Sequence, residues 1–174
     1  MKWAAVLFFC VTAVFTGVYV GSCGWAIPWA ITFGTCFYHF AMRLLVGHTV
    51  DGVMKNHADC RKPWYQLRSF ETHLYNALRV KKWKGNMPTY DPACFDPKLH
   101  SWDEIAQAMC QAEIVHEVII VFSFLPLLAA IFFGAFPVFL VTSLLSAMYD
   151  SSFVIMQRYN RPRVIKLISK KARV

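Results

Sequence analysis

Charged residues are scarce in this chain and absent from long stretches of it. Only 16% of the 174 residues are Asp, Glu, Lys or Arg, whereas 57% are hydrophobic. The apolar residues come in blocks and do not follow the period with which a soluble protein builds its core. This composition argues against a soluble globular protein and predicts one integral membrane domain spanning residues 1–174.

Motifs for a metal centre or a serine nucleophile are missing as well. The six cysteines include no C-x-x-C pair, which excludes a zinc ribbon and gives no sign of a disulfide framework. His57 and Cys60 have ligand-like spacing, but no second pair accompanies them, and we predict no metal site. The chain has neither a G-x-S-x-G motif nor the spaced His and Asp of glycerolipid acyltransferases.

Long apolar blocks take the place of these motifs. Four of them approach the ~20 residues that a helix needs to cross a bilayer, at about 3–20, 25–46, 114–133 and 136–156. Gly134 and Pro137 mark a tight turn between the last two blocks, which therefore predict a helical hairpin. We expect an all-α membrane protein with about four transmembrane helices.

The distribution of positive charge predicts the topology. All 18 Lys and Arg residues lie at Lys2, within 43–98 or within 158–173, and the connections after the first and third blocks contain none. By the positive-inside rule, both termini, the loop 48–113 and the basic tail 157–174 are cytoplasmic. Basic residues beside membrane spans commonly have this role, so the net charge of +8 does not predict nucleic-acid binding.

The N-terminal block has a second interpretation. Lys2, the apolar run after it and the sequence VGSC ending at Cys23 imitate a lipoprotein-type secretory signal, whose cleavage would leave Cys23 as the first residue. We favour a retained helix, because the run is about long enough to span a bilayer and a second block follows almost at once. Both interpretations remain open.

The cytoplasmic loop contains an amphipathic segment. Over residues 64–80, apolar residues recur at helical spacing, which predicts an amphipathic helix lying in the membrane interface. The apolar positions are Leu67, Phe70, Leu74 and Leu78, and the opposite face carries Arg68, Glu71, His73 and Asn76.

A basic cluster with one interfacial aromatic follows this segment. It consists of Arg79, Lys81, Lys82, Trp83 and Lys84. The charge of the cluster favours an anchor to anionic lipid, and the alternative is a docking patch for the phosphates of an activated acyl donor. The sequence leaves both alternatives open.

The segment QAEIVHEVII, residues 111–120, brings ionisable groups to the third predicted span. On a helix, Glu113 and Glu117 lie one turn apart and His116 falls on the same side. A neutral His beside a carboxylate can act as a general base on an alcohol that attacks a carbonyl, which is the chemistry of acyl transfer.

Two further spans place polar groups at a comparable depth. Asp150 lies on the fourth predicted helix, and His39 and Arg43 lie on the second. Each such group costs a few kcal/mol in hydrocarbon, so several at one depth need one another or a water-filled cavity. Taken together they predict a functional site, whereas an Arg43 ion pair with Glu113 or Asp150 that holds the bundle together is the structural alternative.

The fourth predicted span ends in the motif QRYNRPR. A simple basic anchor has no need of Gln, Asn or Pro, so this motif is more specific than a topology signal. Arginine forks suit phosphate or carboxylate oxygens, and the Tyr and Asn can add directional hydrogen bonds. We predict substrate contacts at Gln157, Arg158, Tyr159, Asn160, Arg161 and Arg163.

In chain order, RVKKWKGNMP at 79–88, CQAEIVHE at 110–117 and QRYNRPR at 157–163 resemble the glycosyl-4,4'-diaponeurosporenoate acyltransferase family of small bacterial membrane proteins. The resemblance runs over about 70–167. It implies esterification of a primary hydroxyl on the sugar of a glycosylated C30 carotenoid acid by a fatty acyl group, as in staphyloxanthin-type pigments.

The resemblance supports a catalytic role for His116, with Glu113 orienting it. It assigns substrate binding to the matched residues of the basic cluster and of QRYNRPR, and we add Arg43, Glu117 and Asp150 from their predicted depth. The chain departs from the family pattern at three positions: Gln111, Glu117 and Asp150 stand where Arg, Trp and Asn are expected. These changes shift the local charge, so they bear on the substrate and not on the fold.

The resemblance further implies a protein of the bacterial inner membrane that contacts lipid, a lipid or glycosylated carotenoid acceptor and an acyl donor. We expect an acyl thioester of coenzyme A or a carrier protein as co-substrate and no tightly bound cofactor. The acyl chain, the donor type and the oligomeric state are not fixed by the sequence. A membrane reductase or methyltransferase of lipids, and a non-enzymatic partner subunit or scaffold, are the alternatives.

Overall fold

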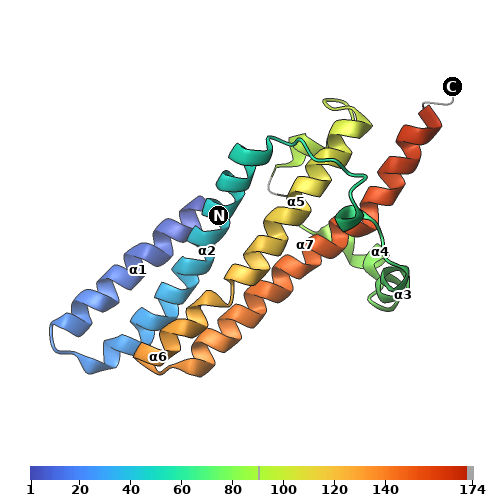
Figure 1. Ribbon diagram of the computed structural model, residues 1–174. Helices are drawn as coiled ribbons and strands as arrows, with labels where there is room; N and C mark the ends of the chain where they lie inside the picture. The colour runs from blue at the N-terminus through green and yellow to red at the C-terminus, as the bar shows by residue number, and fades with distance from the viewer. Residues whose placement is uncertain (90, 172–174) are drawn as a thin grey trace. The chain divides into compact units, whose positions relative to one another are not determined.

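The computed structural model describes residues 1–89 and 91–171, and within these ranges all regular secondary structure is helical (Figure 1). Three stretches are long and apolar enough to cross a membrane: Lys2–Val20, Trp102–Phe133 and Phe136–Lys171. These stretches identify a membrane protein, as the hydropathy predicts. Residues 172–174 of the predicted basic tail lie outside the described residues.

The chain divides into two compact units. Unit 1 consists of Met1–Thr49 and Val118–Asp150, and unit 2 consists of Val50–Glu117 and Ser151–Val174. Charge separates them sharply, because unit 1 contains only three Lys, Arg, Asp or Glu residues: Lys2, Arg43 and Asp150. Unit 1 is therefore the apolar part of the chain and unit 2 the ionic part.

Unit 1 begins with an antiparallel pair of helices, α1 (Lys2–Val20) and α2 (Ile27–Met54), of which residues up to Thr49 belong to this unit (Figure 1). Aromatic rings join them: Phe8 stacks on Phe40 with ring centroids 5.4 Å apart, and Phe15 on Phe33 at 5.7 Å. Such pairs add specificity to a contact between two apolar surfaces.

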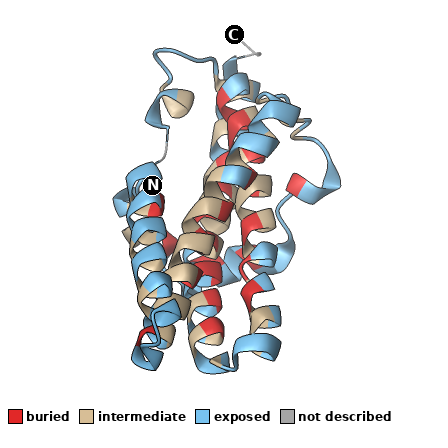
Figure 2. Cartoon of the chain, turned by 90° about the vertical axis from the view of Figure 1, so that its left-hand side faces the viewer, coloured by how far each residue is buried: buried red, intermediate tan, exposed pale blue. Residues whose placement is uncertain are grey.

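Most of the surface of α1 is exposed, and Ala5 is its one buried residue (Figure 2). Large apolar side chains such as Trp3, Leu7 and Val14 lie on this surface. Exposing an apolar surface of this kind to water costs free energy, whereas exposing it to the hydrocarbon of a bilayer does not.

The third predicted span is less regular than the sequence suggests. We expected one helix over 114–133, but α5 (Trp102–Phe122) begins earlier and ends earlier, and a 3₁₀ segment, Leu125–Ala129, precedes the short α6 (Ala130–Phe133). Pro126 explains the break, because it has no N–H to donate and its ring clashes with the carbonyl four residues before, that of Phe122.

The last helix starts from a tight turn. Gly134 has φ 70° and Ala135 has φ 29°, after which α7 (Phe136–Lys171) begins with Pro137 in its first turn. Glycine adopts such positive φ values readily and proline suits a helix start, so the predicted hairpin turn is confirmed. Helix α7 then continues well past residue 156, where we expected the span to end.

Unit 2 contains short elements between the longer helices. After the end of α2 come η2 (Pro63–Tyr65), α3 (Ser69–Ala77), α4 (Val80–Trp83), η3 (Lys84–Asn86) and η4 (Pro92–Phe95), followed by α5 up to Glu117 and α7 from Ser151. Helix α3 is shorter than the amphipathic helix predicted over 64–80. The residues before it are not α-helical: 63–65 form the 3₁₀ helix η2, and the carbonyl groups of 64–66 accept hydrogen bonds from arginines of α7.

Candidate functional site

A buried carboxylate of unit 2 is held between two arginines. Glu113 on α5 is completely buried. Its Oε1 accepts a hydrogen bond from Nη1 of Arg158 at 2.5 Å, and its Oε2 accepts one from Nη1 of Arg161. A buried charge is tolerated only when it is paired and hydrogen-bonded, and both oxygens of Glu113 meet that condition.

The guanidinium of Arg158 donates a hydrogen bond from each of its N–H groups. Besides Glu113, its guanidinium contacts Glu71 of α3 through two bonds, Nε to Oε2 at 2.9 Å and Nη2 to Oε1 at 2.6 Å. The carbonyl groups of Trp64 and Gln66 accept the remaining two bonds, each at 2.9 Å. All five N–H groups of this guanidinium are thereby used.

Arg161 fixes the same segment from inside. It is 1% exposed and donates to Glu113 and to the carbonyl of Tyr65, while its guanidinium carbon lies 5.2 Å from the centre of the Tyr65 ring. Three successive carbonyl groups, at residues 64–66, thus point to arginines of QRYNRPR. They are unavailable for an α-helical ladder, which explains why α3 begins only at Ser69.

Glu71 and Tyr75 extend the network into α3. The Tyr75 hydroxyl donates to Glu71 at 2.5 Å, and both residues are buried. Burial by itself would raise the pKa of Glu71, but the hydrogen bonds from Arg158 and Tyr75 outweigh it and lower this pKa overall. Burial and the bond to Glu71 raise the pKa of Tyr75, so its phenol stays protonated.

His116, the predicted base, lies on α5 beside this network. Its ring stacks on Phe153 of α7 with centroids 4.5 Å apart and an interplanar angle of 6°. One turn from Glu113, Glu117 accepts a hydrogen bond from the indole N–H of Trp64 at 2.9 Å. The structure therefore gives each of the three ionisable residues of QAEIVHEVII a defined position.

The two arginine partners of Glu113 bear on its predicted role. We predicted that Glu113 orients His116, yet both of its carboxylate oxygens accept bonds from arginines. An orienting role through direct contact stays a prediction. The contacts show that Glu113 bridges Arg158 and Arg161 through its two carboxylate oxygens.

The remaining predicted residues of unit 2 have several environments. Gln157 is buried, whereas the Lys81 and Lys82 side chains are exposed. Trp83 donates its indole N–H to the carbonyl of Leu78 at 3.0 Å, and Lys84 donates to Oδ1 of Asn160 at 2.5 Å. The basic cluster and QRYNRPR are thus brought together by the Lys84–Asn160 bond.

Tyr159 and Arg163 lie one turn apart on α7 and contact each other. The Tyr159 ring meets the ring of Tyr75 edge-on, with centroids 5.9 Å apart and an interplanar angle of 82°. The Arg163 guanidinium lies 3.8 Å from the centre of the Tyr159 ring and donates to the Tyr159 carbonyl at 2.9 Å. The three arginines of QRYNRPR therefore differ, since Arg163 is exposed and the other two are held by acids.

Arg43 and Asp150 form their own ion pair in unit 1. Arg43 donates to the buried Asp150 carboxylate and, at 2.8 Å, to the hydroxyl of Ser146, which in turn lies 2.7 Å from the Ser123 hydroxyl. Of the two partners considered for Arg43, the structure has Asp150. Two of the three charged residues of unit 1 thus neutralise each other.

Several residues of the network were not singled out as site residues from the sequence. Glu71, Trp64, Tyr65 and Tyr75 complete the contacts of the two arginines. A signal for Glu71 existed, because it is the one acid in the basic stretch 61–84. Carbonyl contacts carry no such signal, since every residue has a carbonyl group.

Comparison with known proteins gives one match. A family model described as glycosyl-4,4'-diaponeurosporenoate acyltransferase matches residues 61–170, which is more than half of the chain. No curated protein and no solved structure gives a significant match. The matched range includes every residue of the Glu113 network.

Proposed function

The chain belongs to the glycosyl-4,4'-diaponeurosporenoate acyltransferase family and is thus an acyltransferase of carotenoid biosynthesis, and from this premise we propose that it transfers a fatty acyl group to a sugar hydroxyl of a glycosylated carotenoid. The observation that carries the proposal is the position of His116, stacked on Phe153 three residues from the buried Glu113. A histidine held flat in this way is suited to remove a proton from a hydroxyl group.

The proposed reaction has two steps. The sugar hydroxyl oxygen attacks the carbonyl carbon of an acyl thioester while His116 accepts the hydroxyl proton. The carbon–sulfur bond then breaks, and the proton passes from His116 to the departing thiolate. The donor supplies the activation, so the step needs no metal and no tightly bound cofactor.

Arg158 and Arg161 have an indirect role in the proposed reaction. Their donors contact Glu71, Glu113 and carbonyl groups, which supports a role in positioning α3 and the segment before it, and their predicted contact with the substrate stays a prediction. The exposed Lys81 and Lys82, with Arg163, remain available to attract an anionic donor or acceptor.

The membrane arrangement is part of the proposal. Helix α2 is 28 residues long, or about 42 Å at 1.5 Å per residue, which is enough to serve as a fourth span. The absence of Lys and Arg from the connections after the first and third spans supports cytoplasmic termini in the bacterial inner membrane. The exposed Phe70, Leu74 and Leu78 support an interfacial position for α3.

The test uses a host that makes the glycosylated carotenoid acid. Wild type and His116→Gln are expressed at matched levels in the membrane, and the acylated product is measured by mass spectrometry. His73→Gln is the matched control, because His73 is exposed on α3. We expect product from the wild type and the control and a loss of at least a hundredfold for His116→Gln.

Each other outcome has a definite meaning. Equal product from all three proteins would remove His116 as the base. No product from any of them, at normal membrane levels, would contradict the carotenoid acceptor and favour another lipid substrate or a non-enzymatic role. Thermal unfolding of the purified variants distinguishes lost chemistry from lost folding.

A further inference from the structure

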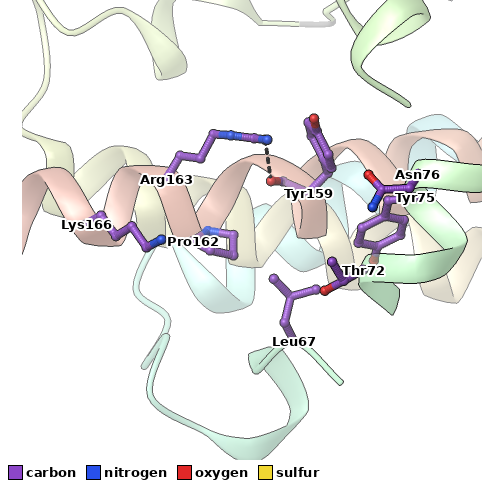
Figure 3. Close-up of a pocket in the computed structure, with 8 residues that line it drawn as sticks. All are labelled: Leu67, Thr72, Tyr75, Asn76, Tyr159, Pro162, Arg163 and Lys166. Atoms are coloured by element: carbon purple, nitrogen blue, oxygen red, sulfur yellow. Dashed lines mark hydrogen bonds between the residues drawn. The ribbon is translucent and has the colours of Figure 1, made fainter. Parts of the chain in front are cut away.

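Unit 2 has a pocket of about 300 Å³ between the α3 region and α7. Figure 3 shows the residues that line it: Leu67, Thr72, Tyr75 and Asn76 from the first region, and Tyr159, Pro162, Arg163 and Lys166 from α7. The lining includes two cations and no acid. Its charge therefore favours an anionic ligand.

Arg163 is preorganised in this lining. The Tyr159 ring lies 3.8 Å from its guanidinium, and the hydrogen bond to the Tyr159 carbonyl fixes one of its five N–H groups (Figure 3). Unlike Arg158 and Arg161, it forms no ion pair with an acid among the described residues. Its other N–H groups can therefore bind a ligand without breaking a contact that holds the fold.

Two further cations accompany Arg163. Lys166 lies three residues along α7, on the same face of the helix, and lines the same pocket. The Lys84 ammonium lies 5.2 Å from the centre of the Tyr159 ring. A phosphate carries several oxygens and is bound best by more than one cation, and the pocket lining provides Arg163 and Lys166, whereas Lys84 lies outside the lining.

Neutral groups complete the lining. The side chains of Thr72 and Asn76 are exposed on α3 and offer a hydroxyl and an amide to a ligand. Leu67, Pro162 and the Tyr75 ring add apolar surface. An anchor to lipid headgroups needs cations but has no use for this set of fixed hydrogen-bonding groups beside an apolar wall.

We propose that this pocket binds the phosphorylated end of the acyl thioester donor, in the form of a coenzyme A thioester. The inference rests on the proposed function, since that reaction requires an activated donor. A pocket of about 300 Å³ is at the lower end of the range for small-molecule sites, so it holds one end of the donor and leaves the rest outside.

The distance along α7 agrees with this assignment. Arg163 lies ten residues beyond Phe153, on which His116 stacks, and ten residues of helix span about 15 Å. A donor whose phosphates bind at Arg163 and Lys166 therefore needs a long, flexible arm between phosphate and thioester. Coenzyme A has such an arm, and a short acyl phosphate does not.

The test measures binding of coenzyme A itself to the full-length purified protein in a neutral detergent, by isothermal titration calorimetry. The double variant Arg163→Gln/Lys166→Gln is compared with Lys170→Gln/Lys171→Gln, which removes the same charge from exposed positions at the end of α7. We expect Kd to rise at least tenfold for the first variant and less than twofold for the second. Equal Kd values in both variants, or no binding by the wild type, would overturn the assignment.

Phospholipid headgroups offer the same phosphate chemistry, and a second measurement separates the two sources. Retention of phosphatidylglycerol by the purified protein in neutral detergent is compared with binding of coenzyme A in the same variants. If the pocket holds a headgroup, Arg163→Gln/Lys166→Gln lowers the amount of phosphatidylglycerol bound and leaves the Kd for coenzyme A unchanged. That result would overturn the donor site.

A single substitution that keeps the charge of the pocket distinguishes lost binding from a folding defect. Thr72→Val keeps the shape of an exposed side chain and removes its hydroxyl, and we expect a several-fold rise in Kd with an unchanged thermal midpoint. Because these titrations contain no acceptor, they do not depend on the carotenoid substrate. Product formation with unchanged Kd values in all variants would reject the pocket and leave the proposed function standing.

Discussion

Arg158 and Glu71 meet in a paired contact: Nε of the arginine lies 2.9 Å from Oε2 of the carboxylate, and Nη2 lies 2.6 Å from Oε1. This geometry is specific to a guanidinium, which presents two parallel N–H groups to the two oxygens of an acid. The contact joins α3 to α7, and Arg158 extends it to the buried Glu113 on α5. Arg158 thus connects three helices of unit 2.

Replacing Arg158 by Lys should destabilise the protein although the charge is kept. A lysine has three donors on a single nitrogen and cannot reproduce the five bonds to Glu71, Glu113, Trp64 and Gln66. We expect a loss of about 1 to 3 kcal/mol, the usual cost of leaving buried acceptors without a donor. Thermal unfolding in detergent measures it, with the exposed Arg68→Lys as the control. Equal midpoints for both variants would contradict the role given to Arg158.

The stability of unit 2 should depend on pH through Glu71. Its pKa is lower in the folded protein than its usual value of 4.5, so its stabilising contribution is complete above pH 4.5. The contribution is lost as the pH falls from 4.5 through the lowered pKa. The difference in stability between wild type and Glu71→Gln should therefore be constant from pH 7 to pH 5 and shrink below 4.5. Unfolding midpoints across this range check the sign, and a difference that grows in acid would refute it.

Arg43 and Asp150 should show strong coupling in a double-mutant cycle. Asp150 is completely buried and the Arg43 side chain is 11% exposed, so either single replacement by Leu leaves a charge in an apolar unit. We expect about 3 to 5 kcal/mol for each single variant. The double variant should be at least about 1 kcal/mol more stable than the sum of the two predicts. Additive losses would show that the two charges do not support each other.

Cys60 and Cys110 should form a disulfide under mild oxidation. Their sulfur atoms lie 2.9 Å apart, in a contact between the segment before η2 and α5. Diamide removes the two thiol hydrogens and is itself reduced to a hydrazine, leaving a sulfur–sulfur bond. Mass spectrometry of proteolytic peptides should find the 60–110 crosslink before any crosslink involving the exposed Cys10 or Cys23. Preferential crosslinking of the exposed pair would contradict the packing of unit 2.

Local patterns in the sequence were sufficient for the class of protein but not for every helix boundary. Apolar blocks, the Gly134 turn and the family motifs correctly indicated a helical membrane protein and its family. The breaks at Pro126 and before Ser69 were not foreseen. The first depends on a single proline within an apolar run, and the second on carbonyl groups whose partners lie about 95 residues away in the chain.

The sequence by itself therefore determined the helical class of the protein, its long apolar segments and its family, because hydropathy and short motifs are carried by neighbouring residues. Only the tertiary structure decided which partners each arginine of QRYNRPR meets. Arg158, Arg161 and Arg163 have the same side chain within six residues, but two of them meet buried carboxylates and the third meets an aromatic ring beside an open pocket. Burial and partners distinguish them, and these come from segments distant in the chain.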